Sequence, residues 1–198
     1  MAAYTKTIQT ELKAITNVSA GVQSISDELA AGTKLAARIF IDVAPEATNV
    51  PGTEFLIQVN QKASGNDGWV TIWSVLSSKS TLDSNAVDGT EAAGSTVIEE
   101  TTTTGLALNA WVFFKNGTLL NSEWAQIVAL VASTSFTIRD GLTNAQTGST
   151  WYNQAERFHA NIDLDTITRL RVVCNNNYAA SPVAIDWRCA CITCDSIG

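Results

Sequence analysis

The sequence predicts an all-β protein, an antiparallel β-sandwich that carries a small inserted β-barrel or meander. Nearly every periodic segment alternates between apolar and polar residues with period two. The segments are short and end at Gly, Asn, Asp or Pro. The best helical candidate, residues 26–37, contains Gly32-Thr33 and runs into the alternating segment LAARIFIDV. We therefore expect no helix longer than a turn or two.

The expected strands follow one another along the whole chain, each bounded by turn-forming residues. They are Leu12–Val18, Gly21–Ser26, Leu35–Val43, Glu54–Ala63, Trp69–Leu76, Thr96–Thr101, Trp111–Lys115, Trp124–Val131, Ser135–Arg139, Phe158–Leu164, Arg169–Asn175 and Val183–Cys194.

The strand Trp124–Val131 differs from the others because both of its faces carry apolar residues. We expect it to be buried on both sides. A tight Ala-Ser-Thr-Ser connection leads to the next strand, in which Phe136 and Ile138 alternate with polar residues before the turn signal Asp140-Gly141. This stretch predicts a compact β unit in mid-chain.

Two small-residue segments, 82–95 and 143–150, predict the domain organisation. We interpret them as linkers around a subdomain inserted into a loop of the sandwich, where insertion is tolerated. The expected domains are a discontinuous β-sandwich of residues 1–84 and 153–198 and an inserted small β subdomain of residues 85–152. One continuous sandwich with a long central excursion is the alternative.

The composition limits the function classes. The chain of 198 residues has a formal net charge of −7, which argues against nucleic acid as a partner. No apolar stretch approaches the length of a membrane span, and the N-terminal MAAYTKTIQTELK has polar residues where a secretory signal would be apolar, so we expect synthesis in a cytoplasm and no membrane partner. Charged residues make up only 16% of the chain. Such a low value fits either a protein packed among copies or a Thr-rich β protein.

The four cysteines are the first candidates for chemistry. Cys174, Cys189, Cys191 and Cys194 could bind zinc, with His159 as a further ligand. However, Cys189 and Cys191 share one face of a strand while Cys194 points to the other. We therefore expect small apolar core residues that are reduced and free of metal.

The other polar candidates form no recognisable catalytic motif. His159 has Asp163 and Asp165 nearby in sequence, but no nucleophile elbow such as G-x-S-x-G accompanies them. Glu99 and Glu100 alternate across a strand and so cannot act together on one substrate. We expect no catalytic residue, no metal and no cofactor.

Two tryptophans form the remaining candidate site. Trp69 and Trp73 share a strand face with Thr71 between them, while Val70, Ile72 and Val75 are expected on the core face. The pair could be an interface between proteins or a platform on which a sugar stacks.

The segments from Val112 to Phe158 and from Asp163 to Gly198 resemble small β proteins of tailed bacteriophages, and Leu35 to Ala47 does so more loosely. The common features are a strand, a small-residue hairpin, a second strand, the DGL turn and a closing strand pair around RLRVV. These phage proteins are virion structural proteins, in particular capsid cement or decoration proteins.

The resemblance implies a jelly-roll-like sandwich, commonly a homotrimer, without catalytic residues. It implies a location on the capsid surface of a virion assembled in the host cytoplasm, with the major capsid protein as partner. A carbohydrate- or receptor-binding β module on the tail or head surface is the alternative function. A hydrolase that uses His159, Asp163 or Asp165 is a more distant third.

Overall fold

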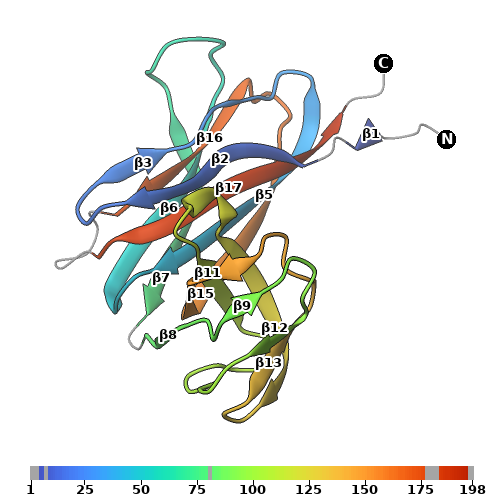
Figure 1. Ribbon diagram of the computed structural model, residues 1–198. Helices are drawn as coiled ribbons and strands as arrows, with labels where there is room; N and C mark the ends of the chain where they lie inside the picture. Colours follow the sequence, from blue (N-terminus) through green and yellow to red (C-terminus); the bar gives the residue numbers. More distant parts are fainter. Residues whose placement is uncertain (1–4, 7–8, 80–81, 177–182, 196–198) are drawn as a thin grey trace. The chain divides into compact units, whose positions relative to one another are not determined.

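The computed structural model describes residues 5–6, 9–79, 82–176 and 183–195, and nearly all of its regular structure is β-strand (Figure 1). The all-β prediction is confirmed, and each of the expected strands is present. The described residues contain one short 3-10 turn, Leu119–Asn121, as their only helical element. The chain divides into two compact units, which we describe separately.

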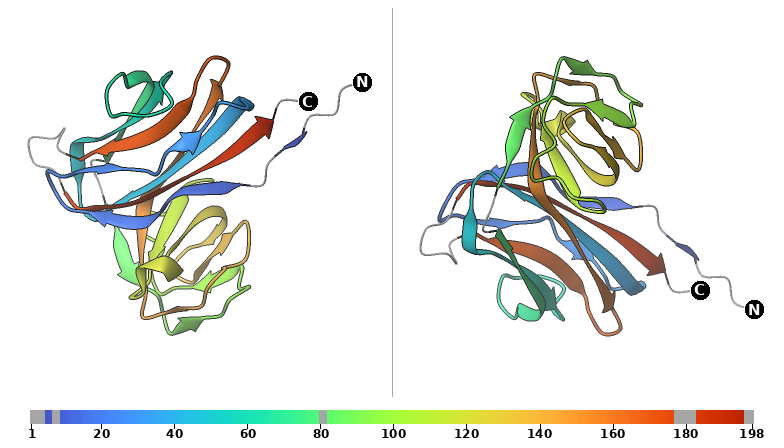
Figure 2. Two further views of the ribbon diagram at one scale, coloured as in Figure 1. Left: turned by 90° about the horizontal axis from the view of Figure 1, so that it is seen from above. Right: turned by 90° about the horizontal axis from the view of Figure 1, so that it is seen from below.

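The first unit comprises residues 1–41, 49–78 and 158–198. Its first sheet has the order β2-β17-β5-β15 and its second the order β3-β16-β6-β7, and the two sheets form two layers (Figure 2). The short strands β1 and β4 pair with β17 and β16. The bounds are β1 Thr5–Lys6, β2 Thr10–Val18, β3 Gln23–Ile25, β4 Leu29–Ala30, β5 Lys34–Pro45, β6 Asn49–Asn60, β7 Val70–Lys79, β15 Thr150–Asp163, β16 Arg169–Asn175 and β17 Ile185–Asp195.

The strand order identifies this unit as a jelly roll. When its eight main strands are numbered in chain order, the first sheet reads 1-8-3-6 and the second reads 2-7-4-5. This is the arrangement of a double-sheet jelly roll built from two Greek keys. The sequence-based prediction of a jelly-roll-like sandwich is confirmed.

Alternation along the strands builds the core of the first unit. In the β16–β6 register, Leu170 lies opposite Val59, and Cys174 opposite Phe55, and all four side chains are buried. Trp187 of β17 in the other sheet packs with Phe55, with ring centroids 5.6 Å apart. The inner faces of both sheets therefore meet in one apolar layer.

The second unit comprises residues 42–48 and 79–157. Its strands lie in the order β15-β11-β12-β13-β10, with β8 on the other edge of β15 and a separate β9–β14 pair. Its core consists of Val87, Ile98, Val112, Phe114, Ala125, Ile127, Phe136, Ile138, Leu142 and Trp151. The bounds are β8 Ser84–Ala86, β9 Thr90–Glu91, β10 Val97–Glu99, β11 Trp111–Lys115, β12 Glu123–Val131, β13 Ser135–Ile138 and β14 Gln146–Thr147.

The two segments expected to be linkers contain strands of the second unit, so only their interpretation as linkers was wrong. The first contains β8 and β9, and the second contains β14. Gln146 is buried, and its side-chain amide donates to the carboxylate of Glu123 at 2.9 Å. Small polar residues here serve tight hydrogen-bonded turns rather than flexible connections. The subdomain boundaries at 84/85 and 152/153 remain a prediction.

The strand β12 is buried on both sides only in its first half. Trp124, Ala125 and Ile127 are buried, but Val128, Leu130 and Val131 are 36%, 36% and 55% exposed. The expectation of burial along the whole strand was wrong. A register shift between β12 and β13 follows Ile127, and the exposed apolar residues of β12 come after it, although Phe136 and Ile138 of β13 still belong to the core.

Candidate interaction surfaces

The residues considered for acid–base chemistry lie on the surface. His159, Asp163 and Asp165 are exposed, and the backbone N–H of Asp165 donates to the Asp163 carboxylate at 3.0 Å. The Asp163 side chain thus stabilises its own turn. Within the part of the chain that the structure describes, no group of three or more His, Cys, Asp or Glu side chains is placed to hold a metal ion.

None of the four cysteines forms a disulfide, and three of them lie in the core. Cys174, Cys189 and Cys191 are buried, and Cys194 is half-buried. Burial raises the pKa of the Cys174 thiol to about 12 and also raises the pKa values of the Cys189 and Cys191 thiols. Because the thiolate is both the nucleophile and the metal ligand, these protonated thiols act as small apolar residues. Freedom from bound metal remains a prediction.

We expect only Cys194 to react quickly with iodoacetamide in the folded protein. The other three thiols should react only after unfolding, because they are protonated and sealed from solvent. Peptide mass spectrometry after a short labelling pulse measures the site of modification, and Cys194→Ser should abolish the fast label. Rapid labelling of Cys189 or Cys191 in the native state would contradict this assignment.

The two adjacent glutamates point to opposite sides, as the alternation predicts. Glu99 is exposed, whereas Glu100 is only 2% exposed. No donor of the described residues reaches either carboxylate oxygen of Glu100 in good hydrogen-bonding geometry. The indole of Trp151, the backbone of Asp88 and the side chain of Asn85 lie near the carboxylate and favour its charged form, but burial outweighs them. Burial raises the pKa of Glu100 to about 7, and the negative charge of Asp88 adds to this effect.

The candidate pair Trp69 and Trp73 is half-buried. The guanidinium carbons of Arg169 and Arg171 lie 4.9 and 4.1 Å from the centroid of the Trp69 ring. Cation–π contacts therefore already occupy ring surface that a sugar would need. An interface or glycan role for this pair remains a prediction.

Most of the other tryptophans are buried or packed within one of the two units. Trp124, Trp151 and Trp187 are buried. Trp111 lies under the guanidinium of Arg157, 4.2 Å from the ring centroid. Most of the six tryptophans therefore pack against other side chains of the same unit.

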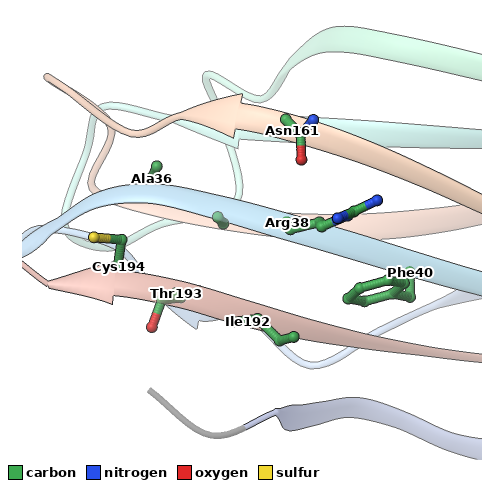
Figure 3. Close-up of a pocket in the computed structure, with 8 residues that line it drawn as sticks. Ala36, Arg38, Phe40, Asn161, Ile192, Thr193 and Cys194 are labelled. Carbon is green, nitrogen blue, oxygen red and sulfur yellow. The ribbon is translucent and has the colours of Figure 1, made fainter. Parts of the chain in front are cut away.

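The first unit has an apolar groove on the outer face of its first sheet (Figure 3). Its volume is about 580 Å³. The lining comes from β5, β15 and β17, and consists of Ala36, Ala37, Arg38, Phe40, Asn161, Ile192, Thr193 and Cys194. The Arg38 guanidinium lies 5.4 Å from the Phe40 ring centroid. The groove suits apolar side chains of another protein, with Arg38 available to a carboxylate.

A second apolar surface lies along β7, and the sequence analysis missed it. Val70 and Ile72, which were expected in the core, are 59% and 44% exposed. Leu76 is 41% exposed. The alternation predicted that Val70 and Ile72 share one side of the strand. It could not show whether the opposite sheet extends far enough to cover these side chains.

No protein-family model matches the chain, and no curated protein matches its sequence. Among solved structures, it is similar to the K3 cleaved adhesin domain of Lys-gingipain from Porphyromonas gingivalis, with a TM-score of 0.38, 8% identity and 86% of this chain covered. The chain spans only 62% of that adhesin chain. The prophage-derived protein YomS of SPBc2 matches with a TM-score of 0.33 and 8% identity over 98% of this chain and 97% of its own.

VP17, a capsid protein of bacteriophage P23-77, matches with a TM-score of 0.20 and 10% identity over 98% of this chain and 100% of its own. These TM-scores lie below 0.5, so the jelly-roll assignment depends on the strand order of the chain itself. Among the described residues, no helix is long and apolar enough to cross a membrane.

Proposed function

We propose that the protein is a non-enzymatic structural component of a bacteriophage particle, a cement or decoration protein that binds neighbouring major-capsid subunits. The observation that carries this proposal is that both units expose apolar side chains, in a chain with few charged residues. Val70 and Leu35 of the first unit are 59% and 42% exposed, and Leu120 and Val131 of the second unit are 69% and 55% exposed. Exposed apolar surface of this kind favours contact with other proteins.

The electrostatics support protein partners over nucleic acid. Lys and Arg number 12 against 19 Asp and Glu, so the chain lacks the basic excess that phosphate contacts require. The resemblance of residues 112–158 and 163–198 to phage virion proteins supports a place on the capsid surface of a virion assembled in the host cytoplasm. The homotrimer implied by that resemblance is part of the proposal.

The mechanism follows from mass action. A protein that binds the assembled shell and not its separated subunits stabilises the shell by RT ln(1 + [L]/Kd) at each site. Because symmetry repeats each contact over the shell, many weak contacts are together sufficient to stabilise it.

The test compares particles with and without the protein. We expect particles that lack it to rupture at a lower temperature, as measured by release of packaged DNA during heating. Adding the purified protein back should restore the original temperature, whereas bovine serum albumin at the same concentration should not. Heads that are equally stable without the protein, or its presence only at the tail tip, would reject the cement role. The second result would favour the receptor-binding alternative.

A further inference from the structure

Strand β7 leaves two kinds of surface uncovered in the first unit. It lies at the end of the second sheet, and among the described strands it pairs only with β6. The backbone groups along its other edge are therefore open to a further strand. On the same strand, the apolar side chains of Val70, Ile72 and Leu76 are exposed at alternating positions.

These three side chains belong to the inner face of the sandwich. The Gln58 side chain donates to the Thr71 hydroxyl at 3.4 Å, which places Thr71 on the outer face with Gln58. Val70 and Ile72 consequently point to the inner side, where they line a groove of about 470 Å³ with Val59. The core layer thus continues under β7 without a covering sheet.

The edge of β7 lacks the usual protection against pairing. Residues 70–78 contain no charged residue and no proline. Lys79 at the end of the strand forms an ion pair with Glu156 at 3.1 Å. Sheet edges in soluble proteins are normally blocked by charges, prolines or bulges, and a long apolar edge without them attracts another strand.

We infer that β7 pairs antiparallel with β7 of a second copy of this chain around a two-fold axis. The strand is complementary to itself, because its first half borders the groove and its second half carries the exposed Leu76. Antiparallel pairing brings each Leu76 towards the groove of the other copy. It also brings no like charges opposite each other, although each chain carries a net charge of −7.

The alternation of the strand restricts the register to axes that fall on a residue, and among these we infer the axis at Ser74 because it brings Ile72 and Leu76 together. Residues directly opposite each other in an antiparallel pair point to the same face. The two inner faces therefore join only if an inner-face residue of one copy lies opposite an inner-face residue of the other, so that the two residue numbers have an even sum. An axis at Ser74 places Ile72 opposite Leu76 on the inner face. The same axis places Trp73 opposite Val75 on the outer face, so the half-buried Trp73 becomes an interface residue.

This contact does not depend on the proposed capsid role, and the purified protein in solution tests it. We expect sedimentation velocity to show a concentration-dependent dimer, or a hexamer in which β7 contacts join two of the proposed homotrimers. Ile72→Glu should raise the dissociation constant at least about 100-fold, because each dimer would bury two carboxylates. Leu120→Glu adds the same charge at a 69% exposed position of the second unit and should leave association unchanged.

A cross-link tests the register in a Cys194→Ser background. Ser74→Cys should form a disulfide-linked dimer under mild oxidation, because the two residues face each other across the axis. Thr71→Cys should not, since its two copies would lie about 20 Å apart along the paired strands. A monomeric or trimeric wild-type protein, or equal association of the Ile72→Glu and Leu120→Glu variants, would overturn the β7 interface. A dimer without the Ser74→Cys cross-link would overturn the register.

Discussion

Replacing Trp187 with alanine is expected to destabilise the first unit by about 3–5 kcal/mol. The indole is fully buried in β17, and its ring centroid lies 5.6 Å from that of Phe55 in the opposite sheet. Truncation would remove a contact that joins the two layers and would leave a cavity between rigid strands, which cannot collapse to fill it. Urea unfolding monitored by far-UV circular dichroism measures the loss.

Trp187→Phe is the matched control for this prediction. It keeps an aromatic ring against Phe55, and the indole Nε1 that it removes has no hydrogen-bond partner in the described structure. Its loss of stability should therefore be clearly smaller than that of the alanine variant. Equal losses for the two variants, or a loss below about 1 kcal/mol for alanine, would show that Trp187 does not join the layers as described.

Replacing Glu100 with glutamine is expected to stabilise the second unit above pH 7 by about 3 kcal/mol. Burial raises the pKa of this carboxyl from 4.5 to about 7 in the folded state. Below pH 4.5 the folded and unfolded states both hold the proton, so Glu100 then carries no penalty. Between pH 4.5 and 7 the unfolded state releases the proton first, and stability falls as the pH rises. Above pH 7 both states are ionised, and the penalty is fully present.

Glutamine has nearly the same shape and no charge, so it should remove this dependence on pH. The measurement is the free energy of unfolding at several pH values from 4 to 8.5 for the wild type and two variants. Glu99→Gln is the matched control, because it removes the same charge from the neighbouring exposed position. The hypothesis fails if Glu99→Gln changes the pH profile as much as Glu100→Gln does.

The local pattern of residues was sufficient to predict most of the longer strands. Period-two alternation located the strands, and for β11 and β16 it predicted both ends. The opposite orientations of Glu99 and Glu100 also followed from alternation alone. These features depend on backbone geometry within a few residues, which the sequence specifies directly.

Long-range packing decided the features that the sequence could not provide. The first half of β15, residues 150–157, was not assigned as a strand because its polar residues do not alternate clearly, yet pairing with β8 and β11 makes it one. The same limit explains β7. Alternation places Val70 and Ile72 on the inner face, but their exposure depends on how far the opposite sheet extends, which only the assembled fold determines.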